Sequence, residues 1–371
     1  MFESLDAKLE EFLTLGVPWN DCVVYHKGEC VYRQVRGTLD LEGKNPARGD
    51  ERINLYSCSK VITCTAALLL FEKGLFRLTD PLSDYLPEYA EMQVKTADGS
   101  LKKAENPIRI IDLFRMTAGF NYNLRSPSLN RLRRETNGVA STRDFARYHA
   151  QEPLDAEAGT IWYYSLAHDV IAALVEVVAD EEFNAFCKRN IFDVVGMPTT
   201  TYLLPSAEYD GVAPHYAYNQ EGKISECSKF PVYRLGERHA SGGAGCVSTV
   251  DDFIKFLEAL RTGKLLKNET LDLMSTDMLS EEQRRGYQDL DYGYGLGVNC
   301  PRRGSDVSDF GWGGAAGCYL VIDRKNEITA FYAQHVLASP VQARRKEVRG
   351  VVIKAICGEY RAKGENNMSN I

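Results

Sequence analysis

The sequence predicts a mixed α/β protein of the α+β type, in which a mostly helical segment interrupts one antiparallel sheet. Strand-like segments occur near both ends of the 371-residue chain, and the long middle holds only short helical patterns and polar loops. Strands from the two ends would then pair in a single sheet. We expect residues 1–72 and 238–363 to form the sheet domain, 73–237 to form the helical domain, and 364–371 to be a disordered tail.

The chain opens with a helix and a hairpin. Between Leu5 and Leu13 apolar residues recur every three or four positions, which predicts an amphipathic helix. Two strand-like segments follow, 22–26 and 30–35. The Lys27-Gly28 pair between them is short enough for a tight turn, so we expect the two strands to pair as a hairpin.

An apolar helix comes next. From Val61 the sequence reads VITCTAALLLFEKG, and a glycine such as Gly74 is typical of a helix C-terminus. Between residues 75 and 235 only two segments have a clear helical pattern, 110–116 and 168–178. Long polar loops separate them.

Strand-like segments return late in the chain. Residues 292–299, 318–322 and 328–334 are short and rich in β-branched or aromatic residues. Asn326 lies in a turn between the last two. A final helix is predicted from about Val341 to Ile356, with valines and isoleucine on one face.

The composition is that of a globular protein without a basic field. Hydrophobic residues make up 44% and charged residues 26% of the chain, and 44 basic against 51 acidic residues give a net charge of −7. This charge argues against a nucleic-acid partner. The longest apolar run, near residues 66–71, is far shorter than the ~20 residues of a membrane span. We therefore expect neither a nucleic-acid nor a membrane partner, while the oligomeric state stays open.

The N-terminus and the cysteines predict a cytoplasmic location. The first twenty residues contain acids where an export signal needs a basic start and an apolar run. The ten cysteines show no CxxC spacing, and several lie in apolar segments, as expected of reduced thiols. The six histidines show no metal-binding spacing, so we expect no metal and no cofactor.

Two S-x-x-K tetrapeptides occur, one beginning at Ser57 and one at Ser100. Ser57 follows the strand-like INLY and opens the apolar helix, so Ser57 and Lys60 share one helical face at i and i+3. The positive end of the helix dipole would also favour an alkoxide at Ser57. Ser100 lies in a polar loop with no helix after it. An N-capping serine beside a solvated lysine is as simple an interpretation, and these four residues alone leave both open.

The nucleophile hypothesis has a chemical basis. A serine hydroxyl is a poor nucleophile until a base takes its proton. A lysine buried beside it can be that base when desolvation favours the neutral amine. The apolar helix around Lys60 could supply this desolvation.

Two further segments could complete such a site. Tyr164 lies in AGTIWYYSL, before a helix, where it is either a packed aromatic residue or a partner that shares a proton with Lys60. The segment 310–317 is rich in glycine and enters a strand. Glycines there let a ligand approach the backbone, and an N–H group could serve an oxyanion hole. A glycine-rich bend without function is the alternative.

These segments, in this order, resemble the serine β-lactamase and penicillin-binding-protein superfamily, above all its class C β-lactamase-related hydrolases and esterases. The pattern is S-x-x-K before a helix, then Y-S-x before a helix, then a G-G pair entering a strand. The separations are 107 residues from Ser57 to Tyr164 and 148 residues from Tyr164 to Trp312. The stretches IRIIDLFRMTAGF, AGTIWYYS and SGGAGCVSTVDDFIKF agree as well. The likeness extends from about Asp21 to Gln334.

The resemblance implies a β-lactamase/transpeptidase-like fold with the site in the cleft between a sheet domain and a helical domain. It implies that Ser57 is the acylated nucleophile and that Lys60 and Tyr164 are an acid/base pair. The backbone N–H groups of Ser57 and Ala315 would form the oxyanion hole.

Two positions depart from the family's pattern. Leu166 stands where members that hydrolyse lactams and peptides usually carry Asn, and Trp312 stands where they carry Lys or His. The sequence therefore lacks an amide for a substrate amide and a cation for a substrate carboxylate, and a charge-assisted bond is worth ~1.5–3 kcal/mol. Trp312-Gly-Gly instead looks like the esterase members.

We therefore predict a serine hydrolase, namely a carboxylesterase that acts on small neutral esters. An amide-directed relative, either a D-amino-acid peptidase or a weak β-lactamase, is the second interpretation, and a non-catalytic binding protein of the same fold is the third. The residues expected to contact the small-molecule substrate are Tyr122, Leu166, His168, Trp312, Gly313 and Gly314. Tyr233 is a further candidate, and a structural role is the simpler interpretation of His168. The basic cluster 344–349 is interpreted as the solvated face of the last helix.

Overall fold

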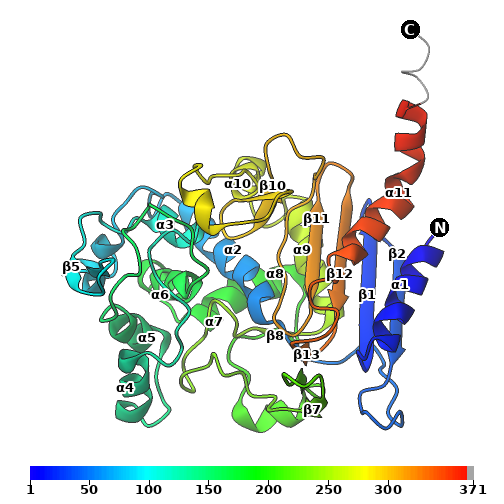
Figure 1. Cartoon of the computed structure of the whole chain (residues 1–371), viewed down its shortest axis with the longest axis horizontal. Coiled ribbons are helices and arrows are strands. Elements are labelled where there is room, and N and C mark those ends of the chain that lie inside the picture. Colours follow the sequence, from blue (N-terminus) through cyan, green and yellow to red (C-terminus); the bar gives the residue numbers. More distant parts are fainter. Residues whose placement is uncertain (366–371) are drawn as a thin grey trace.

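The computed structural model describes residues 1–365 and has the mixed α/β architecture with antiparallel sheets that the sequence predicts (Figure 1). Its strands are β1 Trp19–His26, β2 Glu29–Gly37, β3 Ile53–Asn54, β4 Gln93–Lys95, β5 Leu101–Lys103, β6 Tyr216–Tyr218, β7 Ile224–Glu226, β8 Val247–Ser248, β9 Tyr292–Tyr294, β10 Asn299–Pro301, β11 Tyr319–Asp323, β12 Ile328–Ala333 and β13 Val336–Leu337. Its α-helices are α1 Glu3–Thr14, α2 Ser59–Glu72, α3 Ile110–Phe114, α4 Pro127–Glu135, α5 Thr142–His149, α6 Ala167–Ala179, α7 Phe183–Cys187, α8 Asp193–Val195, α9 Val250–Arg261, α10 Asn268–Met274 and α11 Glu347–Glu365.

The central sheet joins the two ends of the chain. Its strand order is β11-β12-β1-β2, and all neighbouring strands are antiparallel. Val23 of β1 lies opposite Phe331 of β12. Lys27 and Gly28 both have positive φ, 55° and 85°, as a two-residue hairpin turn requires. The sheet is thus assembled from both ends of the chain, and the limits proposed for the two domains stay a prediction.

Helices cover both faces of this sheet (Figure 1). α1 and α11 pack on one face, and α9 packs on the other, against β1, β11 and β12. Side chains of β1 alternate between the two faces, as strand geometry dictates. Cys22 and Val24 are buried with Leu5 of α1, whereas Val23 is buried in the larger core on the opposite side. That larger core contains α2, which also packs against α6 of the helical part.

One predicted strand is in fact two. The segment 292–299 forms β9 and the beginning of β10, which pair as an antiparallel hairpin. Gly297, with a φ of 81°, lies in the turn between them. The chain therefore reverses inside a run whose composition indicates one continuous strand.

The last helix is shifted from its predicted limits. Residues 341–346 form turns, so α11 begins at Glu347 and continues through Glu365. The predicted apolar face is nevertheless buried, with Val348 and Val352 packed in the core under α1. Of the predicted tail, residues 366–371 lie outside the described part of the chain. Among residues 1–365, no helix is both long and apolar enough to cross a membrane.

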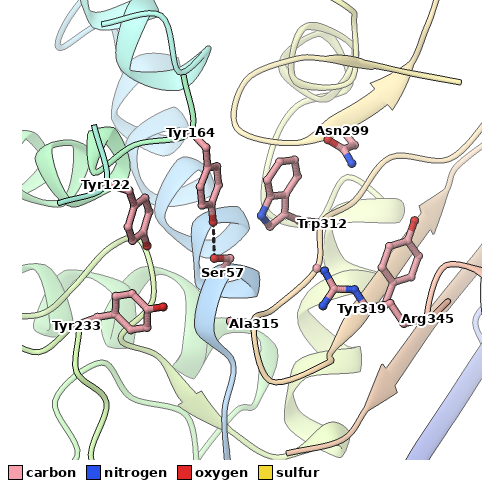
Figure 2. A pocket seen from close by; sticks show the side chains of 10 residues that line it. Ser57, Tyr122, Tyr164, Tyr233, Asn299, Trp312, Ala315, Tyr319 and Arg345 are labelled. Carbon is pink, nitrogen blue, oxygen red and sulfur yellow. Dashed lines mark hydrogen bonds between the residues drawn. The ribbon is translucent and has the colours of Figure 1, made fainter. Parts of the chain in front are cut away.

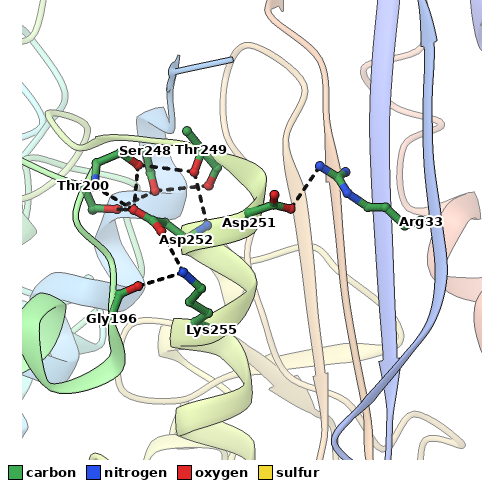
Figure 3. Close-up of polar contacts among 9 residues, drawn as sticks. Arg33, Gly196, Thr200, Ser248, Thr249, Asp251, Asp252 and Lys255 are labelled. Atoms are coloured by element: carbon green, nitrogen blue, oxygen red, sulfur yellow. Dashed lines mark hydrogen bonds and ion pairs between the residues drawn. The ribbon is translucent and has the colours of Figure 1, made fainter. Parts of the chain in front are cut away.

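The segment SGGAGCVSTVDDFIKF stabilises the beginning of α9 (Figure 3). Thr249 is the N-cap residue, and its hydroxyl accepts the N–H of Asp252 at 3.2 Å. The buried carboxylate of Asp252 accepts the N–H and the hydroxyl of Thr199 at 2.8 and 2.6 Å. Asp251 forms an ion pair with Arg33 of β2 at 3.1 Å. These contacts fix the helix that supports the sheet behind the site.

Candidate active site

Ser57 lies where a strand passes into a helix. β3 ends at Asn54, a 3₁₀ turn spans Tyr56–Cys58, and α2 begins directly afterwards. Tyr56 has a φ of 47°, in the left-handed region that residues other than glycine rarely adopt, and such strain clusters at functional sites. The turn places Ser57, which is 8% exposed, at the N-terminal end of α2. The helix dipole there favours negative charge.

Ser57, Lys60 and Tyr164 form one hydrogen-bonded group, which we call the triad. The hydroxyl oxygens of Ser57 and Tyr164 are 2.5 Å apart (Figure 2). Lys60 Nζ donates to Ser57 Oγ at 3.2 Å and to the carbonyl of Gly243 at 2.6 Å. The structure thus brings together the three residues to which the family resemblance assigns catalysis.

Lys60 is fully buried beneath two aromatic rings. Its Nζ lies 4.8 Å from the ring centroid of Tyr164 and 5.3 Å from that of Tyr122. Aromatic faces attract a cation. The surroundings of Lys60 are therefore more polar than the apolar sequence of α2 indicates.

Tyr164 is held in place by stacked rings. Its ring lies parallel to that of Tyr122, with 5.0 Å between centroids and 4° between planes. Trp312 is stacked with it at 6.0 Å and 21°, on the side away from Tyr122 (Figure 2). The N–H of Leu166 donates to the carbonyl of Asn121 at 3.1 Å and fixes the loop that leads into α6. The stack and this bond keep the phenol oxygen beside Ser57.

The glycine-rich segment 310–317 forms the opposite wall of the site. Gly317 has a φ of 106°, and a Cβ there would overlap the side chain of Gln334, so the turn requires glycine. The N–H of Gly314 is bonded to the carbonyl of the residue before β11. The N–H of Ala315 has no acceptor in the part of the chain that the structure describes. It is therefore available to a ligand oxygen.

These residues enclose a cavity of about 500 Å³, a size that suits a small molecule. Its lining residues are Ser57, Tyr122, Tyr164, Tyr233, Asn299, Trp312, Gly313, Ala315, Tyr319 and Arg345 (Figure 2). Half of them are aromatic. Among these described residues only Arg345 carries a charge, so the wall fits an uncharged organic group.

The predicted substrate contacts divide into two sets. Tyr122, Trp312 and Gly313 line the cavity. Leu166 and Gly314 are not among its lining residues. Leu166 is 2% exposed and packs in the large core, and Gly314 lies against the backbone of the strand end before Ser57.

His168 also lies away from the cavity. It is fully buried, and its Nε2 is 3.8 Å from the thiol sulfur of Cys64 in α2. Burial lowers the pKa of His168 well below its ordinary value, and the positive charge of Lys60 lowers it further. A neutral imidazole in this place fits the structural role.

Three lining residues were not predicted, namely Asn299, Tyr319 and Arg345. Tyr319 follows the glycine-rich segment by two positions, and strand alternation after it is a signal that could have found this residue. Arg345 corrects the interpretation of the basic cluster as solvated, because its guanidinium donates to the carbonyl of Gly314. Arg349 pairs with the buried carboxylate of Asp309 at 2.6 Å.

The second S-x-x-K lies on the surface. Ser100 is exposed in the turn between β4 and β5, and its hydroxyl donates to Asp98 at 2.8 Å. Lys103 is exposed as well and pairs with Glu91 at 2.6 Å. No hydrogen bond or ion pair joins this serine and this lysine in the part of the chain that the structure describes.

The chain is similar to known proteins over most of its length. The sequence model of the family described as Beta-lactamase matches residues 7–352. Esterase EstB of Burkholderia gladioli is 28% identical over 333 residues, which cover 81% of this chain and 82% of EstB. Lovastatin esterase of Penicillium rubens is 28% identical over 342 residues, with 83% and 86% covered.

A solved structure described as EstCE1, a hydrolase with promiscuous acyltransferase activity, has the same fold. It superposes with a TM-score of 0.77 at 24% sequence identity, and the match covers 94% of this chain and 98% of EstCE1.

Proposed function

This chain belongs to the Beta-lactamase family, and we propose that it hydrolyses small neutral esters through an acyl-enzyme on Ser57. The family match confirms the resemblance that the motifs predict. With esterases among its relatives over four fifths of the chain, the protein is an enzyme, a serine hydrolase of the esterase type. The observation that carries the proposal is the triad, in which Ser57 Oγ contacts Tyr164 at 2.5 Å and Lys60 at 3.2 Å beside an aromatic cavity.

The first half of the proposed reaction acylates Ser57. Tyr164 enters the reaction as the phenolate. Ser57 Oγ attacks the carbonyl carbon of the ester, and the serine proton passes to this phenolate oxygen, 2.5 Å away. The N–H groups of Ser57 and Ala315 stabilise the oxyanion that forms. When the ester C–O bond breaks, the leaving oxygen takes the proton from Tyr164 and departs as an alcohol.

The second half releases the acid. A water molecule attacks the acyl carbonyl and gives a proton to Tyr164, again with the oxyanion at the two N–H groups. The bond to Ser57 Oγ then breaks, Oγ takes the proton back, and the carboxylic acid leaves. Tyr164 takes and returns the proton in both halves, and Lys60, its partner in the acid/base pair, is bonded to the same Ser57 oxygen.

The walls of the site support a neutral ester. The side chain of Leu166 lies in the core, so no amide reaches the cavity from that position. Trp312 presents an indole face where amide-directed relatives carry a cation. The one lining cation, Arg345, is already bonded to a backbone carbonyl. The amide-directed interpretation therefore stays second.

We also propose that the enzyme works in the reducing cytoplasm on a small molecule. Cys22, Cys58, Cys64 and Cys318 are buried free thiols. Burial raises the pKa of Cys22 and of Cys318 to about 12, which keeps them protonated and unreactive. Their state supports a reducing environment, and the net charge of −7 disfavours a nucleic-acid partner.

Covalent labelling tests the proposed function. After exposure to a fluorophosphonate, intact mass should show one adduct, and peptide mapping should place it on Ser57. Ser57→Ala should abolish both the adduct and the hydrolysis of short p-nitrophenyl esters. Ser100→Ala is the matched control and should keep both, since Ser100 lies on the surface.

Two results would contradict the proposal. An adduct on Ser100 would overturn the assignment of the nucleophile. Efficient turnover of a penicillin without turnover of simple esters would favour the amide-directed interpretation instead.

A further inference from the structure

A buried carboxylate lies beneath the triad. Asp169 follows Tyr164 by five residues, on the first turn of α6, and is 2% exposed. Its Oδ1 accepts a hydrogen bond from the hydroxyl of Ser241 at 2.6 Å. Its Oδ2 is buried and accepts no hydrogen bond of ordinary geometry from the described residues. The proposed reaction gives this carboxylate no role.

Gly243 separates Asp169 from Lys60. Its carbonyl accepts a hydrogen bond from Lys60 Nζ at 2.6 Å. A Cβ on Gly243 would overlap Asp169 Oδ2 and lie 3.3 Å from Lys60 Nζ. The carboxylate oxygen and the lysine nitrogen therefore flank the same point from two sides, and only glycine leaves that point open.

The other polar neighbours of Asp169 are hydrogen-bond donors. His239 accepts the N–H of Leu235 at its Nδ1, at 3.0 Å, so its proton is on Nε2. That Nε2 faces Asp169 Oδ1 at 4.0 Å. The hydroxyl of Ser241 donates, as described above. These neighbours all donate hydrogen bonds and none of them is a second carboxylate, so the surroundings favour a negatively charged Asp169.

Burial and the neighbouring donors have opposite effects on the pKa of Asp169. Burial raises the pKa of Asp169 above its ordinary value, and the hydrogen bond from Ser241, the charge of Lys60 and the N–H of Gly243 offset that rise in part. Burial lowers the pKa of His239 to about 3, so this ring is neutral and Lys60 supplies the positive charge.

Apart from Tyr164, the remaining titratable groups around the pair carry no charge near neutral pH. Burial lowers the pKa of His168, and burial raises the pKa values of three tyrosines and of the Cys58 and Cys64 thiols, which feel the charge of Asp169 or Lys60. The tyrosines are Tyr89, Tyr122 and Tyr233.

We infer that Asp169 is the buried counter-charge of Lys60, a positioning residue that keeps the lysine as an ammonium beneath Ser57 and Tyr164. The inference rests on the proposed function and deepens it, because it separates the two members of the acid/base pair. With Lys60 as an ammonium, the proton of Ser57 passes to the oxygen of Tyr164, 2.5 Å away, and Lys60 stabilises the negative charge at that oxygen. Lys60 itself neither gains nor loses a proton during turnover.

The pH dependence of the variant Asp169→Asn tests this inference. We expect Asp169→Asn to lower kcat/KM on p-nitrophenyl butyrate at least tenfold at about pH 8. The alkaline limb of its kcat/KM profile should move to lower pH by about 1 to 3 units, the usual effect of one nearby charge, since Lys60 then loses its proton more easily. A residue that only packs would leave the position of this limb unchanged.

Asp252→Asn is the matched control. Asp252 is buried to a similar extent, 3% exposed against 2%, and its carboxylate is hydrogen-bonded at the beginning of α9, but it does not lie beside Lys60. The alkaline limb of the kcat/KM profile of Asp252→Asn should stay at the same pH as in the wild type. An unmoved limb in Asp169→Asn, or higher activity at neutral pH, would overturn the inference. Labelling of wild-type Ser57 separates this inference from the proposed function. If Ser57 is labelled but the alkaline limb of Asp169→Asn does not move, the role of Asp169 is wrong and the assignment of the nucleophile stands.

Stability gives a second test that does not depend on activity. Lys60→Met should leave the carboxylate buried and uncompensated, and so should lower the melting temperature by several degrees. Adding Asp169→Asn to Lys60→Met should raise the melting temperature again. If instead the two losses simply add, the two residues are not a charge pair.

Discussion

Lys60 and Tyr164 both contact the hydroxyl of Ser57. This shared contact predicts how the effects of substituting the two residues on kcat combine. Lys60→Ala and Tyr164→Phe should each lower kcat strongly and by similar factors. The double variant should lose far less than the product of the two single losses, because residues that act as a unit are non-additive. A kinetic double-mutant cycle with a p-nitrophenyl ester measures this coupling. Fully multiplicative losses would count against a shared role.

The position of Trp312 in the cavity wall predicts how substitutions there change kcat/KM for neutral and for carboxylate-bearing substrates. Trp312→Lys should lower kcat/KM on neutral esters, since it removes an aromatic wall and the ring stacked on Tyr164. It should improve acylation by carboxylate-bearing substrates about tenfold or less, because one unpaired substrate amide still costs ~1 kcal/mol. Trp312→Phe keeps an apolar ring and should retain activity on neutral esters. The same set of esters and penicillins, assayed with both variants, decides the matter.

At the scale of single elements, the beginning of α9 is a stabilising device that lies apart from the chemistry. Asp252→Ala should lower the free energy of unfolding by about 2 kcal/mol, since it removes bonds from a buried carboxylate to the backbone and hydroxyl of Thr199. The kcat of the folded variant should not change. Urea unfolding followed by circular dichroism measures the loss. Asp251→Ala, which breaks a largely exposed ion pair with Arg33, should stay within about 0.5 kcal/mol of the wild type.

The elements also explain which parts of the site a sequence can predict. Ser57 could be told from Ser100 because a strand before it and an apolar helix after it are both local patterns. Tyr164 and Ala315 became visible through ordered motifs. Asn299 and Arg345 come from segments that only the folded chain brings to the cavity, so no local pattern marks them.

Asp169 shows the same limit more clearly. It stands beside His168 in an apolar helical pattern, where a charged residue usually indicates the solvated face. In the fold that turn of α6 packs under α2, so the carboxylate is buried with Lys60. The strand predicted over 292–299 was wrong for a related reason, because residue preferences do not show a reversal that glycines permit.

At the scale of the whole molecule, buried neutral histidines predict a loss of stability in mild acid. Burial lowers the pKa of His149 to about 4, below its ordinary value of about 6.5 in the unfolded chain. Between these two values the unfolded state binds the proton and the folded state does not. The stability that the neutral ring provides is therefore complete above about pH 6.5 and is lost as the pH falls toward 4, by roughly 1.4 kcal/mol per unit.

His149→Gln tests this sign. Glutamine does not titrate and can still accept the hydroxyl of Tyr89, which lies 3.1 Å from His149 Nδ1. The variant should lose less free energy of unfolding than the wild type when urea unfolding is compared between about pH 7 and about pH 5. His26→Gln, at the partly exposed end of β1, is the control and should follow the wild type. An equal loss in His149→Gln would show that this ring is not responsible.

The pairing of β1 with β12 has a consequence for biosynthesis. The two strands are about 310 residues apart in the chain, so β1 leaves the ribosome long before its partner exists. At 5–20 residues per second this wait lasts roughly 15 to 60 s. During that time the β1-β2 hairpin exposes an unpaired strand edge, which is a template for pairing with other chains. We therefore expect chains that stop before β12 to aggregate more readily than the complete chain.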